Sequence, residues 1–283
     1  MDYATLNNGV KMPMVGFGVF QVPEAKQAEQ AVTDALETGY RHIDTAAVYL
    51  NEGAVGAAVK KSGIPREDIF ITTKIWVQDY GYENALKAFE LSRKRLGVDY
   101  IDLYLMHKPY GDYYGAWRAM EKLYREGFIR AIGVTSFSDE RLQDLFLHNE
   151  VKPAVNQIET NVWRQQHDSE LFLCGEGIQM EAWAPFAEGK LDVFKNPVLA
   201  RIAEKHGATT GQVQLRWLNQ RGVVVIPKTV HKERMAENLN IFGFTLDTDD
   251  MAQIAALDTG KSPIYDETDL ATVRGIGTFT FHD

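Results

Sequence analysis

Eight short runs rich in β-forming residues alternate with helical patterns along most of this 283-residue chain. The runs lie at residues 14–18, 42–45, 69–75, 101–107, 129–135, 155–158, 179–183 and 223–227. Apolar residues at helical spacing follow them, such as Trp117, Met120 and Leu123, or Leu142 and Leu145. Eight units match a closed (β/α)8 TIM barrel, whereas a doubly wound sheet normally reverses direction after about three units. The pattern therefore predicts an α/β barrel.

Two further segments flank the eight units. Asn7-Asn8-Gly9 separates two β-forming stretches near the N-terminus, which is typical of a tight β-hairpin. After the eighth unit we expect one more helix, at about residues 249–257, and then a polar tail. Because no Pro-, Ser- or Gly-rich linker interrupts the pattern, we expect a single domain over residues 1–283.

Composition excludes several classes of protein. Hydrophobic residues make up 45% of the chain and charged residues 24%, so the chain can bury a large core and is not mainly disordered. The formal net charge of −9 repels a phosphate backbone, so we expect no nucleic-acid partner.

The sequence also favours a cytoplasmic protein. Cys174 is the single cysteine and cannot form an internal disulfide. The N-terminus lacks the pattern of a signal peptide, and no run of 18 apolar residues follows, so we expect no contact with a membrane.

Four polar residues stand at or just after the ends of three adjacent predicted strands. Asp44 ends the second strand, Tyr49 follows in its loop, Lys74 ends the third strand and His107 ends the fourth. Since functional groups of a barrel lie at the carboxyl ends of its strands, we expect these side chains to meet at one mouth.

Together the four residues suit the reduction of a carbonyl group. Asp44 would keep Lys74 charged, and that charge is expected to lower the pKa of Tyr49 from its usual ~10, so that Tyr49 serves as general acid. A neutral His107 would donate a hydrogen bond to the same carbonyl oxygen. Each residue alone is more often a helix cap, a solvated strand end or a packing residue, but four together favour catalysis.

An anion site is predicted after the eighth strand. Lys228 and Arg234 flank the start of a helical segment, where backbone N–H groups and a guanidinium would bind phosphate. Loops after strands seven and eight often hold phosphate in barrels. A solvated basic turn is the alternative.

Other motifs point to no site. Gly16-Phe17-Gly18 is followed by Gln21 where a dinucleotide fingerprint needs a third glycine, so no Rossmann domain is indicated. The seven histidines show no metal-ligand spacing with one another or with Cys174, so we expect no metal.

The chain resembles the aldo-keto reductase superfamily over residues 9–257. The resemblance rests on Gly39-Tyr40-Arg41-His42-Ile43-Asp44-Thr45-Ala46 with Tyr49, Thr73-Lys74, Leu105-Met106-His107, Gly133-Val134, Val155-Asn156-Gln157 and Ile226-Pro227-Lys228, in family order. It implies a barrel that binds NADPH in extended form, with Tyr49 as acid and Asp44, Lys74 and His107 around it.

The resemblance also implies a set of cofactor-binding residues. Thr135, Ser136 and Gln157 would lie near the nicotinamide carboxamide, and Trp183 would stack on the ring. Lys228, Thr229 and Arg234, with Val230 in the same loop, would meet the 2′-phosphate, and Glu237 and Asn238 match positions that contact adenine.

Three residues depart from the family pattern. Ser136 stands where Asn is usual, and Trp183 replaces the commoner Tyr but keeps a stacking face. Lys108 stands where a Trp usually follows the catalytic His. Lys108 could pair with a substrate carboxylate beside Phe20, Trp76, His107 and the tyrosines at 110, 113 and 114, or its ammonium could reach solvent while its stem covers apolar surface.

We therefore expect a monomeric NADPH-dependent reductase of aldehydes or ketones, whose physiological substrate the sequence does not identify. One alternative is a barrel lyase that forms a Schiff base on Lys74, although Asp44 would hold that lysine charged. A second alternative is a cofactor-binding regulatory subunit, as some members of the superfamily resemble ion-channel auxiliary proteins.

Overall fold

The computed structural model describes residues 2–283 and contains the predicted barrel. Eight parallel strands follow one another around it, in the spatial order β10-β9-β8-β7-β6-β5-β4-β3. They are β3 (Phe17–Gly18), β4 (His42–Asp44), β5 (Phe70–Ile75), β6 (Ile101–Met106), β7 (Ile129–Thr135), β8 (Val155–Glu159), β9 (Gln179–Trp183) and β10 (Val224–Val225). A parallel bridge between Val15 and Val225 joins the two ends of this order. The prediction of a (β/α)8 barrel is confirmed.

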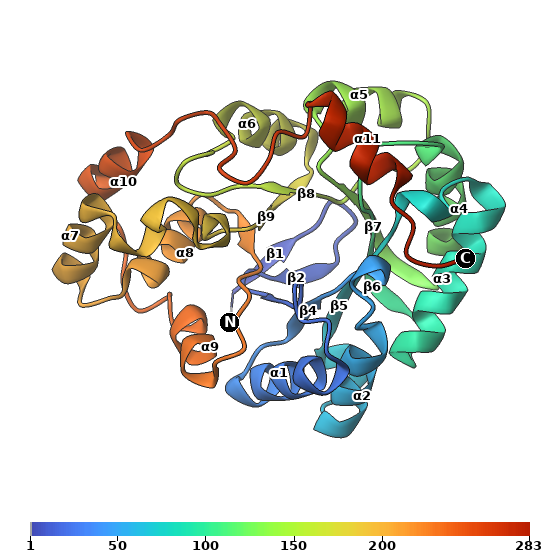
Figure 1. Ribbon diagram of the computed structural model, residues 1–283, viewed down its shortest axis with the longest axis horizontal. Helices are drawn as coiled ribbons and strands as arrows, with labels where there is room; N and C mark the ends of the chain where they lie inside the picture. Colours follow the sequence, from blue (N-terminus) through green and yellow to red (C-terminus); the bar gives the residue numbers. More distant parts are fainter. Residues whose placement is uncertain (1) are drawn as a thin grey trace.

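Helices surround the strands, as Figure 1 shows. They are α1 (Ala25–Thr38), α2 (Glu52–Ser62), α3 (Tyr82–Leu96), α4 (Tyr113–Arg125), α5 (Asp139–Leu147), α6 (His167–Glu176), α7 (Pro197–His206), α8 (Thr210–Gln220) and α9 (Lys232–Leu239). Every barrel strand is followed by at least one of them, and β9 is followed by both α7 and α8. Within residues 2–283, no helix is both long and apolar enough to cross a membrane.

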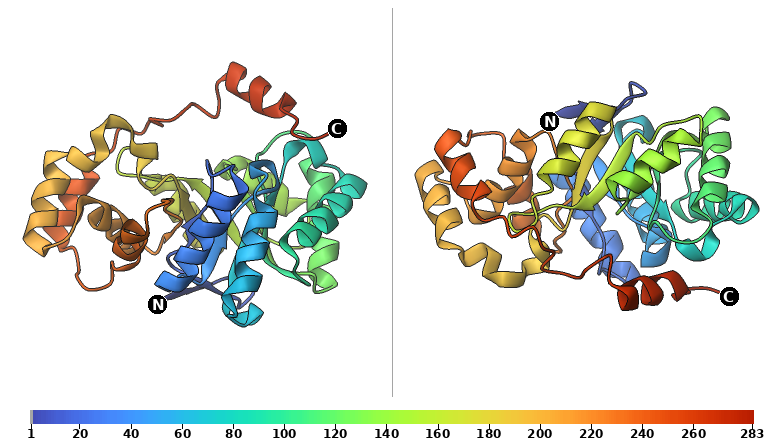
Figure 2. Two further views of the ribbon diagram at one scale, coloured as in Figure 1. Left: turned by 60° about the horizontal axis from the view of Figure 1, so that its bottom comes forward. Right: turned by 90° about the horizontal axis from the view of Figure 1, so that it is seen from above.

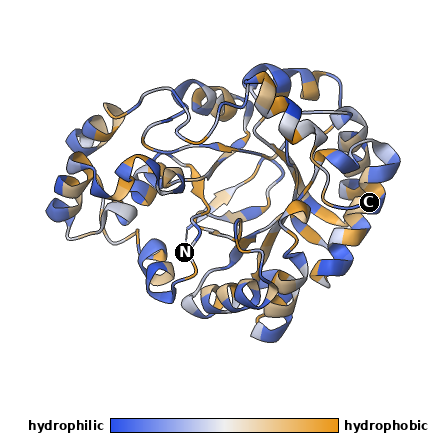
Figure 3. Cartoon of the chain, in the orientation of Figure 1, coloured by the Kyte–Doolittle hydropathy of each residue, from blue (hydrophilic) through white to orange (hydrophobic). Residues whose placement is uncertain are grey.

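Buried apolar side chains of the strands and of the surrounding helices form one large core cluster. Figure 3 shows more orange on the strands and more blue on the helices around them. β5 and β6 are buried at every position, as expected for parallel strands that are covered on both faces. The predicted N-terminal hairpin consists of β1 (Tyr3–Thr5) and β2 (Lys11–Pro13). Its Leu6 and Met12 belong to the same apolar cluster as Leu103 and Val155, so the hairpin covers one end of the barrel.

The tail differs from its prediction. The expected helix after the eighth unit is α10 (Thr248–Ala255), but the tail also contains α11 (Leu270–Thr278). No residue of α11 is fully buried. Figure 2 shows the tail at the opposite end of the barrel from the hairpin.

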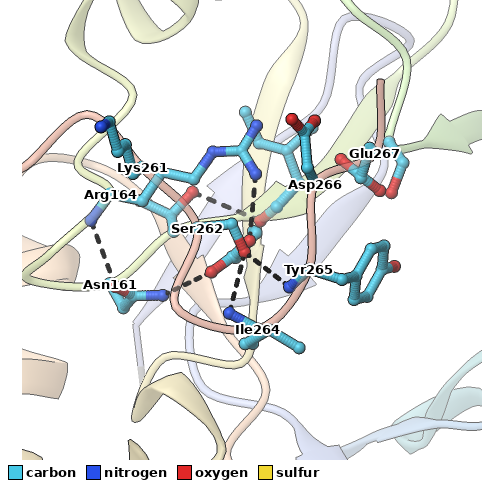
Figure 4. A network of polar contacts seen from close by, with 12 residues as sticks. Asn161, Arg164, Lys261, Ser262, Ile264, Tyr265, Asp266 and Glu267 are labelled. Carbon is cyan, nitrogen blue, oxygen red and sulfur yellow. Dashed lines mark hydrogen bonds and ion pairs between the residues drawn. The ribbon is translucent and has the colours of Figure 1, made fainter. Parts of the chain in front are cut away.

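The tail is fixed where it leaves the barrel. Thr259 donates hydrogen bonds from its N–H and Oγ1 to the carbonyl of Trp163, at 2.9 and 2.8 Å. Ser262 Oγ then accepts from the backbone N–H of Ile264 and Tyr265. Figure 4 shows this turn beside Asn161 and Arg164. The tail thus starts near the end of β8 and is directed across the mouth.

Candidate active site

A cavity of about 1280 Å³ opens where the barrel strands end. Its wall includes residues that follow β3, β4, β5, β6, β9 and β10, together with residues of the tail. Pockets for one small ligand usually measure roughly 300–1,000 Å³, so this cavity has room for a cofactor and a substrate.

Asp44 and Lys74 form a buried ion pair at the floor of the cavity. Asp44 ends β4, Lys74 lies in β5, and Lys74 Nζ donates to Asp44 Oδ1 at 2.6 Å and to the carbonyl of Thr45 at 2.9 Å. Lys74 is 0% exposed and Asp44 2%. The Lys74 nitrogen is held by these two acceptors, so the site gives no support to the Schiff-base alternative.

Tyr49 and His107 face each other across the same floor. Tyr49 ends the 3-10 turn Ala47–Tyr49 after β4, and His107 directly follows β6. The Tyr49 hydroxyl lies 3.5 Å from His107 Nε2, and Lys74 Nζ lies 5.4 Å from the centre of the Tyr49 ring. The four residues predicted at the strand ends therefore do meet at one end of the barrel.

The protonation of Tyr49 differs from the expectation. Burial raises the pKa of the Tyr49 hydroxyl well above its usual value, and the negative charge of Asp44 raises it further. The expected lowering by Lys74 is therefore wrong for the chain alone, because loss of water is the largest effect on this hydroxyl. Tyr49 holds its proton firmly.

His107 is neutral in the structure. Burial lowers the pKa of its imidazole well below the usual range, and the charges of Lys74 and Lys108 lower it further. Its Nδ1 is buried and has no hydrogen-bond partner among residues 2–283. A neutral imidazole of this kind can donate one hydrogen bond to an oxygen in the cavity.

A second buried acid, Glu181, lies behind the ion pair. Gln157 Nε2 donates to Asp44 Oδ2 at 3.0 Å and to Glu181 Oε2 at 2.8 Å, which connects the two acids. Burial and the charge of Asp44 raise the pKa of Glu181 to about 8. His42 lies 3.8 Å from Glu181, but burial lowers the pKa of His42 to about 3. Sequence reasoning missed Glu181, which no strand-end pattern distinguishes.

The far end of the cavity is lined by the residues predicted to bind an anion. They are Lys228, Thr229 and Arg234, and beside them lie Glu237 and Asn238, which were predicted to contact adenine. Within the described chain, Lys228 and Arg234 form no ion pair, whereas the neighbouring Lys232 is paired with Glu37 and Asp34. Val230, predicted with them, instead packs toward Val22 and Ala28.

Three further predicted cofactor residues lie at the ends of β7 and β9. Thr135 and Trp183 line the cavity, and Thr135 Oγ1 donates to the carbonyl of His107 at 2.6 Å. Ser136 has a φ of +58°, a left-handed conformation that Asn adopts more readily than Ser. Its Oγ accepts a hydrogen bond from Lys108 Nζ at 2.9 Å.

Lys108 is buried, so the expectation of an ammonium in solvent is wrong. Its side chain lines the cavity, yet Nζ also donates to Tyr265 Oη at 2.8 Å and to Glu267 Oε1 at 2.7 Å. Lys108 is 6% exposed, and with Ser136 these partners occupy all three ammonium protons. The positive charge that Lys108 was expected to offer to a substrate carboxylate is already balanced by Glu267 of the tail.

Aromatic side chains form the wall beside Tyr49. The Phe20 ring lies 5.0 Å from that of Tyr49, and the Trp76 ring lies 5.0 Å from that of His107. The tyrosines at 110, 113 and 114 lie elsewhere: Tyr110 Oη donates to the carbonyl of Glu267, Tyr113 packs on Phe137, and Tyr114 bonds to Asp144. Their expected place on the substrate wall is wrong.

The tail supplies wall residues that the sequence did not reveal. Tyr265, Ile276 and Phe279 line the cavity. The Tyr265 ring stacks on Trp183 with centres 6.0 Å apart, and Trp76 Nε1 donates to the carbonyl of Phe279 at 2.8 Å. Apolar and aromatic residues in the tail, among them Ile276 and Phe279, were the available signal.

Comparison with known proteins places the chain in a family. The family model described as Aldo/keto reductase family matches residues 14–259. The glyoxal reductase of Bacillus subtilis (strain 168) is 49% identical over 257 residues, covering 90% of this chain and 92% of that protein.

Two solved structures show the same barrel. An aldo-keto reductase from a Medee basin deep-sea metagenome library has a TM-score of 0.92 and 45% identity, covering 94% of this chain and 99% of that one. An aldo-keto reductase of Bombyx mori in complex with NADP has a TM-score of 0.88 and 32% identity, covering 96% of each chain. These likenesses do not support a Schiff-base lyase, and the family uses NADPH. The chain belongs to the aldo/keto reductase family and is an NAD(P)H-dependent oxidoreductase.

Proposed function

We propose that this protein reduces an aldehyde or ketone to an alcohol with NADPH, using Tyr49 as general acid. The proposal rests on the distribution of residues along the cavity. One end holds a tyrosine, a neutral histidine and a paired lysine, and the other end holds two cations without ion-pair partners among residues 2–283. This distribution suits a long ligand with a phosphate at one end and a reacting group at the other.

Tyr49 and His107 both act on the carbonyl oxygen of the substrate. NADPH, when bound, supplies a hydride to the carbonyl carbon. Tyr49 gives its proton to the carbonyl oxygen, and His107 donates a hydrogen bond to the same atom and orients it. Because burial raises the pKa of Tyr49, the proton stays in place until negative charge develops on that oxygen.

Lys74 then stabilises the negative charge that proton transfer leaves on Tyr49. Loss of the proton leaves a phenolate on Tyr49, and the ammonium of Lys74 is the nearby positive charge. Asp44 fixes that ammonium at 2.6 Å. We therefore assign Tyr49 the proton transfer, His107 the orientation of the oxygen, and Lys74 with Asp44 the stabilisation of the phenolate.

The cofactor would extend from this centre toward α9. Trp183 offers a flat face for the nicotinamide ring, and its carboxamide would lie near Thr135 and Gln157, which line the cavity, and near Ser136, which follows Thr135 in the chain. Lys228, Thr229 and Arg234 offer charge and hydrogen-bond donors for the 2′-phosphate, with Val230 in the same loop and Glu237 and Asn238 toward the adenine. Neither Lys228 nor Arg234 forms an ion pair with another residue among 2–283. No ion pair therefore has to break before these side chains can bind the phosphate.

The substrate side of the cavity is mainly apolar. We assign Phe20, Trp76, His107 and Lys108 to it, together with Ile276 and Phe279 of the tail. Because Glu267 already balances the charge of Lys108, this wall favours carbonyl compounds without a carboxylate.

Lys108 and Glu267 give a test of that preference. In Glu267→Gln, the ammonium loses its carboxylate partner, and we expect kcat/KM for a keto acid to rise about fivefold relative to the matched amide, since a partly screened ion pair contributes about 1 kcal/mol. The ratio of kcat/KM for a matched acid and amide pair measures the effect. Adding Lys108→Met should abolish the gain. An unchanged ratio in Glu267→Gln would show that Lys108 does not reach the substrate.

We also expect the reaction to need no metal. No group of three His, Cys, Asp or Glu side chains among residues 2–283 could hold a metal ion, and Tyr49 and His107 act on the oxygen directly. Dialysis against a strong chelator should leave the rate of NADPH oxidation unchanged. Loss of activity that zinc restores would contradict this assignment.

The proposal is tested by following NADPH oxidation with aldehydes, ketones and keto acids. We expect turnover of neutral carbonyl compounds, and no turnover with any member of the panel would reject the proposal.

We further propose a cytoplasmic monomer that forms a single domain over residues 1–283 and binds neither nucleic acid nor membranes. The net charge of −9 and the single cysteine, Cys174, support this part of the proposal.

A further inference from the structure

Glu181 is a buried acid to which the proposed reaction gives no role. It lies in β9, is 0% exposed, and pairs across the sheet with Gln157 of β8. Its Oε2 accepts the hydrogen bond from Gln157, whereas Oε1 has no hydrogen-bond partner in the described chain. Burying a carboxyl group costs free energy unless it is compensated, so its place behind a cavity residue needs an explanation.

The two acids fix the orientation of the Gln157 amide. A carboxylate only accepts hydrogen bonds, and Gln157 Nε2 donates one hydrogen to Asp44 Oδ2 and the other to Glu181 Oε2. Both donors of the amide are therefore used on its inner side. Within residues 2–283, Gln157 Oε1 accepts no hydrogen bond, and Gln157 lines the cavity.

The hydrogen bond from Gln157 does not require Glu181 to be charged. Oε1 has no other partner, and a proton placed there would leave Oε2 free to accept from Gln157. His42 does not compete, because its Nε2 lies 3.8 Å from Oε1 and is within 3.0 Å of Thr72 Oγ1.

We infer that Glu181 is a positioning residue, which acts through Gln157 to present the amide oxygen to the carboxamide NH2 of the cofactor. The inference rests on the proposed function, since it needs the nicotinamide end of NADPH to lie at Gln157. Asp44 alone would hold one Nε2 hydrogen and leave the amide free to tilt. Glu181 holds the second hydrogen and fixes the plane of the amide before the cofactor arrives.

Two substitutions separate hydrogen bonding from packing. Glu181→Met keeps a side chain of similar length and removes the acceptor, whereas Glu181→Gln keeps an acceptor oxygen for Gln157 and places its NH2 where Oε1 has no partner. Tryptophan fluorescence of the enzyme without substrate would report binding of NADP⁺ and of 2′,5′-ADP. The second ligand has the phosphate end and lacks the nicotinamide.

We expect Glu181→Met to bind NADP⁺ about tenfold more weakly, the effect of losing about one hydrogen bond, and to bind 2′,5′-ADP as wild type does. Glu181→Gln should bind both ligands within about twofold of wild type. In a Gln157→Ala background, Glu181→Met should cause no further loss of NADP⁺ binding, because the residue through which it acts is gone. If Glu181→Met does not fold, Glu181→Val, which suits a strand, replaces it.

Several results would overturn the inference. Unchanged NADP⁺ binding in the folded Glu181→Met variant would show that Gln157 needs no second partner. Equal weakening of NADP⁺ and 2′,5′-ADP would show that Glu181 supports the fold and not the amide. Binding to the wild-type protein is measured before any variant is made. If the wild type binds neither NADP⁺ nor 2′,5′-ADP, the proposed function is rejected.

Discussion

Replacing Tyr49 with Phe should lower kcat/KM for carbonyl reduction by at least ~10², because general acid catalysis typically contributes 10² to 10⁴. The hydroxyl is the proton donor that lies within reach of both His107 and the charge of Lys74. The Phe ring keeps the contact with Phe20, whose centre is 5.0 Å away, so the wall of the cavity is preserved. Steady-state kinetics on one neutral aldehyde would measure the loss.

A matched control identifies the cause of that loss. Binding of NADPH to Tyr49→Phe should stay within about twofold of wild type, because the Tyr49 hydroxyl acts on the carbonyl oxygen and is assigned no contact with the cofactor. Tyr265→Phe removes another cavity hydroxyl, one that accepts from Lys108, and should retain most of the activity. Near-normal turnover by Tyr49→Phe would exclude Tyr49 as the acid.

The second large effect is expected at Arg234. Arg234→Ala should weaken NADPH binding about 10- to 100-fold, the effect of one charge-assisted hydrogen bond, and should hardly change NADH binding. The reason is that Arg234 lines the cavity and forms no ion pair with residues 2–283, so its guanidinium is available to the 2′-phosphate. Fluorescence titration with both cofactors would measure the two dissociation constants.

Lys232 provides the control for general charge. It lies in the same helix, α9, but its ammonium is paired with Glu37 at 2.5 Å and with Asp34 at 3.6 Å. Lys232→Ala should therefore change NADPH binding less than about threefold at physiological salt. An equal loss of NADPH and NADH binding in Arg234→Ala would assign Arg234 to the fold instead of the phosphate.

The barrel and its four strand-end residues were predictable because they follow from local pattern. The bounds of β7 and β9 agree with the predicted ranges, 129–135 and 179–183, although Arg130 and Glu181 interrupt the apolar residues of these strands. The predicted strands at 14–18 and 223–227 are shorter in the structure, at Phe17–Gly18 and Val224–Val225. These two strands close the barrel, and their pairing depends on residues more than 200 positions apart.

The surroundings of the site residues could not be predicted from local sequence pattern. Lys108 is buried because Glu267 and Tyr265, far away in the chain, cover it. Burial raises the pKa of Tyr49, and a sequence shows the charged neighbours of a residue but not its burial. The pairing of Gln157 with Glu181 likewise depends on the register between β8 and β9.

The proposed function requires that hydride pass from NADPH to a carbonyl carbon. The most direct test supplies NADPH carrying deuterium at C4 of the nicotinamide and analyses the alcohol formed from a neutral aldehyde. We expect one deuterium on the carbinol carbon for each NADPH oxidised, provided that both C4 positions are labelled. An alcohol without deuterium, or no oxidation of NADPH with any carbonyl compound, would exclude hydride transfer from NADPH to the carbonyl carbon.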